Sequence, residues 1–243
     1  MTDAIQDYYE LRIYRCLPGR LPDLHHRMGY EIPHIFDRHG VSRPLAYWDG
    51  FGGVFNPLYA YILPWKSLDD RFRAFGGFYT DPEWIAHRDA SNAGAQMIDR
   101  LDLMILRPSP HWEALKTPGE AKPVGGVHEL RLQRLSTRNA AEAHRVLAED
   151  ELPYLRERGA TILGVFTVWF GWQTPQAVIL LAWPDIETRQ SAMEAYDGDP
   201  AMQAIRKAER ERFGGPLFGS ADTHLMRPAP YGVAHTNLSP LPG

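Results

Sequence analysis

Cysteine is almost absent from this sequence of 243 residues, which contains only Cys16. A single cysteine cannot form an internal disulfide, and it cannot supply the several thiolates of a structural zinc site. Blocks of lysine and arginine are also absent, and the formal net charge is −4. Proteins that bind nucleic acids need a basic surface, so we expect no nucleic-acid partner.

Long apolar runs are missing as well. The longest, AVILLAW at residues 177–183, is far too short to cross a bilayer, so we expect no membrane insertion. The opening residues, MTDAIQDYYELR, show neither the basic stretch nor the apolar stretch of a secretory signal. These absences together predict a cytoplasmic protein in a reducing environment.

The sequence lacks the common motifs for nucleotide, hydrolase and zinc chemistry. It has no G-x-G-x-x-G, no P-loop, no G-x-S-x-G and no H-E-x-x-H. His34 and His39 are five residues apart and would not share a helix face, so they do not suggest a metal site. We predict no cofactor, while a metal assembled from distant residues or a haem with one axial ligand stays open.

What the sequence does contain is an internal repeat. The matching segments are separated by 118 to 120 residues: ELR at 10–12 and 129–131, EIPHIFDRHG at 31–40 and ELPYLRERG at 151–159, LPWKSLDDR at 63–71 and LAWPDIETR at 181–189, and ILRPSP at 105–110 and LMRPAP at 225–230. Such a long period does not fit a solenoid and indicates two copies of one small domain. We place the copies at residues 1–110 and 127–230, with a linker at 111–126 and a loosely wrapping Pro-rich tail at 231–243.

The same order of elements is predicted in each copy. A strand at about 8–16 or 127–135 precedes a helix at about 19–39 or 137–158, and two strands follow. Ser67 with Asp70, and Asp81 before Pro82, then predict the starts of two helices, and a final strand ends at Arg-Pro. The order βαββ(α)αβ predicts an α+β fold of two ferredoxin-like repeats.

The motifs of the first copy resemble the NIPSNAP family. The resemblance is carried by YELRIY at 9–14, Pro18-Gly19, Pro33 with His39-Gly40, Tyr47-Trp48, the segment from Trp65 to Arg71, Asp81-Pro82-Glu83-Trp84 and Leu106-Arg107-Pro108. The second copy matches more loosely. The resemblance implies a dimeric α+β barrel, in which two antiparallel sheets pack face to face, here formed within one chain. It leaves a further homo-oligomer open.

The wider barrel superfamily implied by this resemblance includes cofactor-free monooxygenases, isomerases, lyases, haem enzymes and ligand-binding regulators. Fold alone does not choose among these activities. Histidines near neutrality suit acid–base chemistry, and the first copy has more of them than the second. We therefore predict His34, His39 and His25 as catalytic residues, although helix-surface or helix-capping roles explain them equally well.

Aromatic side chains are the second group of candidate site residues in the first copy. Tyr14, Tyr47, Trp48, Tyr59 and Trp84 are predicted to wall a substrate pocket between the sheet and its helices. The alternative is that these rings form ordinary core.

One strand in each copy carries an opposite-charge pair, Glu10 with Arg12 and Glu129 with Arg131. These strands are central in a ferredoxin-like sheet, and buried charges require partners. We predict that the two pairs meet across the seam between the copies as a structural ion-pair network. The alternative is a substrate-anchoring role.

Two functions remain open from the sequence. The first is an enzyme that acts on a small apolar or aromatic molecule as a cofactor-free lyase, isomerase or oxygenase. The second is a non-catalytic ligand-binding or assembly module. A haem- or metal-dependent enzyme is a third alternative.

Overall fold

The computed structural model describes residues 8–238. The first half contains four strands and a layer of helical segments: β1 (Tyr8–Cys16), α1 (Leu21–His26), the π-helix η1 (Arg27–Glu31), α2 (Pro33–His39), β2 (Ala46–Gly52), β3 (Leu58–Trp65), α3 (Leu68–Thr80), α4 (Pro82–Ser91) and β4 (Ile98–Pro108). The predicted helix starts are confirmed, because the Ser67 and Asp81 side chains accept hydrogen bonds from the first turns of α3 and α4. Pro33 begins α2, since proline tolerates the first helical turn.

The second half repeats this order after the short helix α5 (Trp112–Leu115). Its elements are β5 (Val127–Leu135), α6 (Ala140–Val146), the π-helix η2 (Leu147–Glu151), α7 (Leu152–Glu157), β6 (Thr161–Phe170), β7 (Gln176–Trp183), α8 (Ile186–Gly198), α9 (Pro200–Phe213), β8 (Phe218–Pro228) and the 3-10 turn η3 (Thr236–Leu238). Both halves therefore have the predicted ferredoxin-like order.

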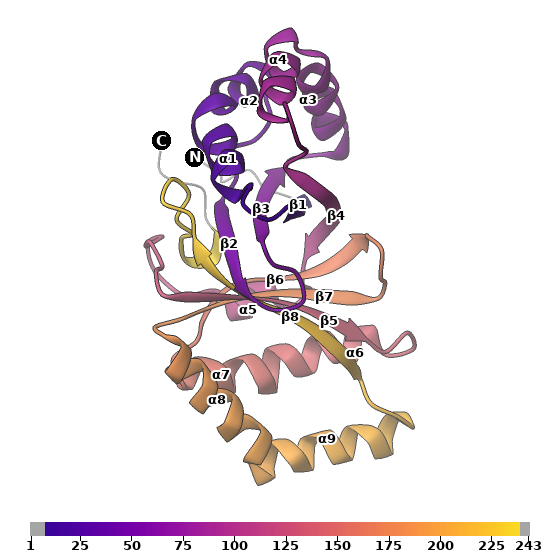
Figure 1. The fold of residues 1–243 in the computed structure, drawn as a ribbon. Helices are drawn as coiled ribbons and strands as arrows, with labels where there is room; N and C mark the ends of the chain where they lie inside the picture. The colour runs from indigo at the N-terminus through magenta and orange to yellow at the C-terminus, as the bar shows by residue number, and fades with distance from the viewer. Residues whose placement is uncertain (1–7, 239–243) are drawn as a thin grey trace.

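The eight strands close into one antiparallel barrel in the order β1-β3-β2-β8-β5-β7-β6-β4. Each half contributes one four-stranded sheet, and the sheets join edge to edge where β2 pairs with β8 and β4 pairs with β6. Closure leaves no free sheet edge. The predicted barrel within one chain is thus confirmed. Figure 1 shows the helices of the two halves on opposite sides of it.

Period-two alternation divides each sheet between two cores. All eight strands send apolar side chains into the barrel, among them Leu11 and Ile13 of β1 and Leu130 and Leu132 of β5. The opposite face of each sheet packs against the helices of its own half. Each half therefore has a sheet–helix layer in which a site can form separately from the barrel interior.

This alternation corrects the predicted seam. Glu10 and Arg12 alternate with Leu11 and Ile13, so they point toward the first-half helices and away from the second sheet. Glu10 is bonded by Arg12 and Arg71 within the same half, and no ion pair joins the two halves' strand charges in residues 8–238. The prediction chose the wrong face because both faces of this sheet are buried.

The linker and the start of the tail pack against each other. Val124 N donates to Ala234 O at 2.8 Å, and Asn237 exchanges two side-chain hydrogen bonds with the Thr117 backbone. Leu238 is buried in the barrel core. The expected loose tail is therefore wrong as far as Leu238, and residues 239–243 lie outside the described range. Within that range no helix is long and apolar enough to cross a membrane.

Candidate functional site

A cavity of about 270 Å³ lies between the first-half sheet and the helices that cover it. Its walls come from β1, β3 and β4 on one side and from the α1–η1–α2 segment, α3 and α4 on the other. The apolar side chains at the wall are Leu24, Met28, Ile32, Phe36, Phe78, Trp84, Ile98 and Leu101. The cavity is thus small and largely apolar or aromatic, as ligand pockets usually are.

Arg12 brings a positive charge to the sheet side of this cavity. Its Nε donates to Glu10 Oε1 at 2.7 Å, and its Nη1 donates to Tyr79 Oη at 3.1 Å and to Tyr61 Oη at 3.4 Å. Glu10 in turn accepts from Arg71 Nε at 2.8 Å and Trp65 Nε1 at 3.2 Å. The network fixes the guanidinium in place while its Nη2 has no hydrogen-bond partner among the described residues.

Arg27 brings a second buried guanidinium from the helix side. It is the first residue of η1, is only 4% exposed, and stands 5.6 Å from the Trp84 ring centre. Within residues 8–238 it forms no ion pair, and its Nε and Nη2 lack hydrogen-bond partners. Burial lowers its pKa, and the nearby Glu31 carboxylate, which forms no ion pair with it, offsets this effect only in part.

Two tyrosine hydroxyls complete the polar part of the cavity. Tyr14 Oη and Tyr61 Oη are 2.9 Å apart, and both residues are buried at the cavity wall. Burial raises the pKa of Tyr61 well above its ordinary value, so its phenol is neutral and can donate a hydrogen bond. One of the two hydroxyls donates to the other, so one tyrosine hydroxyl and two guanidiniums offer donors to this apolar cavity.

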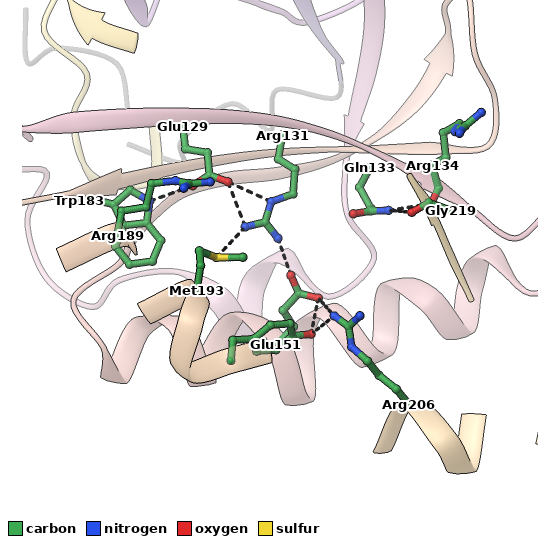
Figure 2. A network of polar contacts seen from close by, with 11 residues as sticks. Glu129, Arg131, Gln133, Arg134, Glu151, Trp183, Arg189, Met193, Arg206 and Gly219 are labelled. Carbon is green, nitrogen blue, oxygen red and sulfur yellow. Dashed lines mark hydrogen bonds and ion pairs between the residues drawn. The ribbon is translucent and has the colours of Figure 1, made fainter. Parts of the chain in front are cut away.

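The equivalent place in the second half holds a smaller cavity of about 230 Å³, and its charges are satisfied internally. Figure 2 shows Arg131 between Glu129 and Glu151, with N–O distances of 3.0 and 2.5 Å. Tyr196 Oη donates to Glu151 Oε2 at 2.9 Å, and Arg206 lies 3.8 Å from the same carboxylate. In the first-half cavity, Arg12 and Arg27 keep donors without partners among residues 8–238, whereas in the second-half cavity Glu151 lies beside both Arg131 and Arg206.

The repeated sequence and the fold together decide the family. The NIPSNAP family model matches residues 9–111 and 128–231, which is most of the chain. This chain belongs to the NIPSNAP family. A search of curated proteins finds no match to this NIPSNAP chain.

Solved structures resemble the NIPSNAP chain in fold. An anthrone oxidase-like protein matches with a TM-score of 0.58 and 16% identity over 93% of both chains. A protein from Lactobacillus acidophilus, described as a candidate monooxygenase, matches with a TM-score of 0.54 and 9% identity over 95% of this chain and 99% of its own. A NIPSNAP protein from Agrobacterium tumefaciens is 23% identical and covers 42% of this chain and 88% of its own, with a TM-score of 0.37.

The three histidines predicted as catalytic do not line the cavity of this NIPSNAP protein. His34 is bonded to Glu83 at 2.7 Å, and His39 is bonded to Asp81 at 2.6 Å, both at the surface between α2 and α4. The second of these bonds lowers the pKa of Asp81, whose carboxylate also caps α4. These contacts match the helix-surface alternative, because each histidine is held by a carboxylate of a neighbouring helix.

His25 lies in a different cluster. Its Nε2 is 2.8 Å from Asp49 Oδ1, and its Nδ1 is 2.7 Å from the hydroxyl of Tyr231, which follows β8 of the second half. Tyr231 Oη is also 3.0 Å from Tyr59 Oη. This cluster fastens the end of the second half onto the first-half helix layer.

Of the five aromatic residues predicted to bind substrate, Tyr14 and Trp84 line the cavity. Trp48 instead points into the barrel, where its Nε1 donates to His128 Nδ1 at 2.9 Å. Tyr47 and Tyr59 belong to the sheet–helix core beside Tyr231. The sequence placed these rings on one sheet without showing which face each one takes.

Arg27, Tyr79 and Arg88 are polar residues of the cavity wall that sequence reasoning missed. The available signal was Arg27 itself, which follows Leu24 at a spacing of three on a helix that must bury one face. For metals, no group of three or more His, Cys, Asp or Glu side chains in residues 8–238 is arranged to hold an ion.

Proposed function

We propose that the first-half cavity is the active site of a cofactor-free enzyme that acts on a small aromatic molecule with a carbonyl or phenolic oxygen. The observation that carries the proposal is the meeting of an apolar, aromatic wall with the hydroxyls of Tyr14 and Tyr61 beside Arg12. Fold likeness to an anthrone oxidase-like protein and to a candidate monooxygenase supports an oxidation of this kind.

The chemistry follows from the donors. When a C–H bond conjugated with an aromatic carbonyl through the ring loses its proton, negative charge develops on the carbonyl oxygen. Neutral hydroxyl donors and a fixed guanidinium stabilise that charge most strongly in a site that excludes water. Tyr61 suits this role, because burial keeps it protonated and Arg12 holds its oxygen in place.

Anthrone is a suitable probe of this reaction. Its methylene group loses a proton to water or a buffer base to give an enolate, which O₂ oxidises to anthraquinone. The methylene carbon gains one oxygen atom as a carbonyl, its two hydrogens leave, and the second oxygen atom is released as water. The atoms and electrons balance with O₂ as the oxidant, so no bound cofactor is required.

Oxygen uptake in the presence of anthrone tests the proposal. We expect wild-type protein to exceed the buffer rate and Tyr61→Phe to slow the reaction about a hundredfold, the usual effect of removing one oxyanion donor. Tyr59→Phe is the matched control, since this buried tyrosine of the same strand bonds Tyr231 outside the cavity. An unchanged rate in Tyr61→Phe would contradict the assigned role.

A non-catalytic ligand-binding role is the second candidate. It is favoured by one observation: none of the histidines predicted as acid–base groups lines the cavity, and the buried Tyr61 is not available as a base. Saturable binding of anthrone, detected by quenching of tryptophan fluorescence, without oxygen uptake above the buffer rate would select this candidate.

A further inference from the structure

We infer that the first-half cavity selects aromatic molecules that carry a carboxylate, with that carboxylate held by Arg12, Arg27 and Arg88. This inference rests on the proposed function, because it assigns a substrate class to the same cavity. Three observations carry it: two buried cations with unused donors, an internal carboxylate bonded to Arg131 at the equivalent place in the second half, and a first-half counterpart, Glu31, that lies beside His26 and His87 and forms no ion pair with Arg12 or Arg27 within residues 8–238.

The two buried guanidiniums are the first observation. Arg12 is 3% exposed and Arg27 is 4% exposed, and both line the cavity. Arg12 Nη2 and Arg27 Nε and Nη2 are buried without a hydrogen-bond partner among residues 8–238. A buried charge is costly unless an opposite charge satisfies it, so these donors fit an anion that arrives with the ligand.

The second half shows where such an anion would lie. Arg131 follows Glu129 as Arg12 follows Glu10, and both carboxylates are held by a tryptophan and an arginine of their own half. Between Arg131 and Arg206 lies the carboxylate of Glu151 (Figure 2). This carboxylate also accepts a hydrogen bond from Tyr196. The second-half cavity is thus filled at its cationic centre by a carboxylate of the protein.

Each of these residues has a counterpart in the first half. Arg88 follows the capping residue Asp81 at the same spacing as Arg206 follows Asp199, and Arg88 lines the first cavity. Glu31 ends η1 as Glu151 ends η2. The two halves therefore start from the same set of one carboxylate and two arginines around this position.

The first half places the carboxylate of this set differently. Glu31 lies 3.5 Å from His26 Nε2 and 3.7 Å from His87 Nδ1, and it forms no ion pair with Arg12 within the described residues. Arg27 opens η1 where Leu147 opens η2, so the cavity gains a third cation. The position that Glu151 fills in one half is left to a ligand carboxylate in the other.

A pair of probes of equal shape tests the inference on the full chain. Isothermal titration calorimetry with 2-naphthoate and its neutral analogue 2-naphthamide should show the carboxylate binding about tenfold tighter or more, as expected for charge-assisted hydrogen bonds. In Arg27→Met this preference should disappear, while the affinity for the amide changes little. Arg43→Met is the charge-matched control, because Arg43 is exposed and pairs with Asp37 outside the cavity.

The outcomes separate the inference from the proposed function. Equal affinity of the two probes for the wild type, or a preference that survives in Arg27→Met, would overturn the carboxylate assignment and leave aromatic binding intact. Failure of both probes to bind would count against the cavity as a site altogether. If Arg27→Met does not fold, Arg88→Gln provides the same comparison from the partly exposed rim.

Discussion

At the scale of single residues, Arg27 shows how a buried charge can lower the stability of a fold. Its guanidinium is buried and forms no ion pair within residues 8–238, so its desolvation lowers the stability of the folded protein. Functional sites often retain such groups because ligand contacts need them. The effect of replacing Arg27 on stability can therefore be measured without a substrate.

We expect Arg27→Met to raise the free energy of unfolding by about 1 kcal/mol or more, because methionine keeps much of the side-chain volume and removes the buried charge. Urea denaturation at pH 7 measures the change. A variant less stable than the wild type would mean that the guanidinium is satisfied in a way that these contacts do not show.

Two buried histidines should make stability depend on pH. Burial is the largest cause that lowers the pKa of His128 and of His144 from the ordinary 6.5 to about 4. Above pH 6.5 each is neutral in both the folded and the unfolded chain. Between 6.5 and 4 only the unfolded chain takes up the proton, so each site removes up to about 3 kcal/mol of stability as pH falls through this window.

Nuclear magnetic resonance titration of the histidine rings checks this expectation directly. His128 accepts a hydrogen bond from Trp48 at Nδ1, and His144 lies between Ser109 and Thr167. Both should remain neutral down to about pH 5. Midpoints near 6.5 for the buried pair would contradict the expectation.

Residue-level reasoning from the sequence succeeded where a local rule applies and failed where side-chain direction matters. The capping roles of Ser67 and Asp81 followed from short-range patterns. The face taken by Glu10 and Arg12 did not, because apolar side chains stand on both faces of β1. Arg27 was missed although its spacing of three from Leu24 places it on the buried helix face.

At the scale of elements, the two π-helices mark the divergence of the halves. η1 and η2 occupy the same place between two α-helical segments, and π-turns often occur at functional sites. One begins with Arg27 and the other ends with the buried Glu151. The sequence predicted the surrounding helix but not the π-turn, which depends on packing over the sheet.

Removing the internal carboxylate should open the second-half cavity to anions. Glu151→Ala leaves Arg131 without one of its two carboxylate partners, and breaking a buried pair costs about 3–5 kcal/mol. We therefore expect a lower melting temperature that added sodium benzoate restores in part, beyond the effect of equal sodium chloride.

Thermal melts of Glu151→Ala, wild type and Glu149→Ala make the comparison. Glu149 is half exposed and pairs with Arg145 at the surface, so its removal should change the melting temperature little. A wild-type melting temperature for Glu151→Ala, or no larger benzoate effect than in the wild type, would show that this carboxylate does not neutralise the site.

At the scale of the whole molecule, the sequence predicted the architecture because the repeat is visible in the chain itself. Two copies of a ferredoxin-like unit with buried sheets imply face-to-face packing once a family resemblance suggests a barrel. The strand pairs β2–β8 and β4–β6 then join the halves along both edges. The charged residues that distinguish the two cavities could not be predicted, because only the folded structure brings their side chains together.

The joined edges predict one cooperative unit. A protease site inserted after Gly119, in the exposed part of the linker, should cut the chain without separating it. We expect the nicked protein to elute as a single particle in gel filtration and to melt in one calorimetric transition. The uncut protein is the control, and elution as two fragments without denaturant would contradict the interlocked barrel.

The location of the two cavities has a consequence for how a duplicated protein can change over evolutionary time. Each cavity is walled by the sheet and helices of its own half, whereas the barrel interior draws on all eight strands. After a duplication and fusion, substitutions inside the barrel must suit both copies, but those under the helices affect one copy alone. One copy can therefore lose ligand binding while its strands still form half of the barrel.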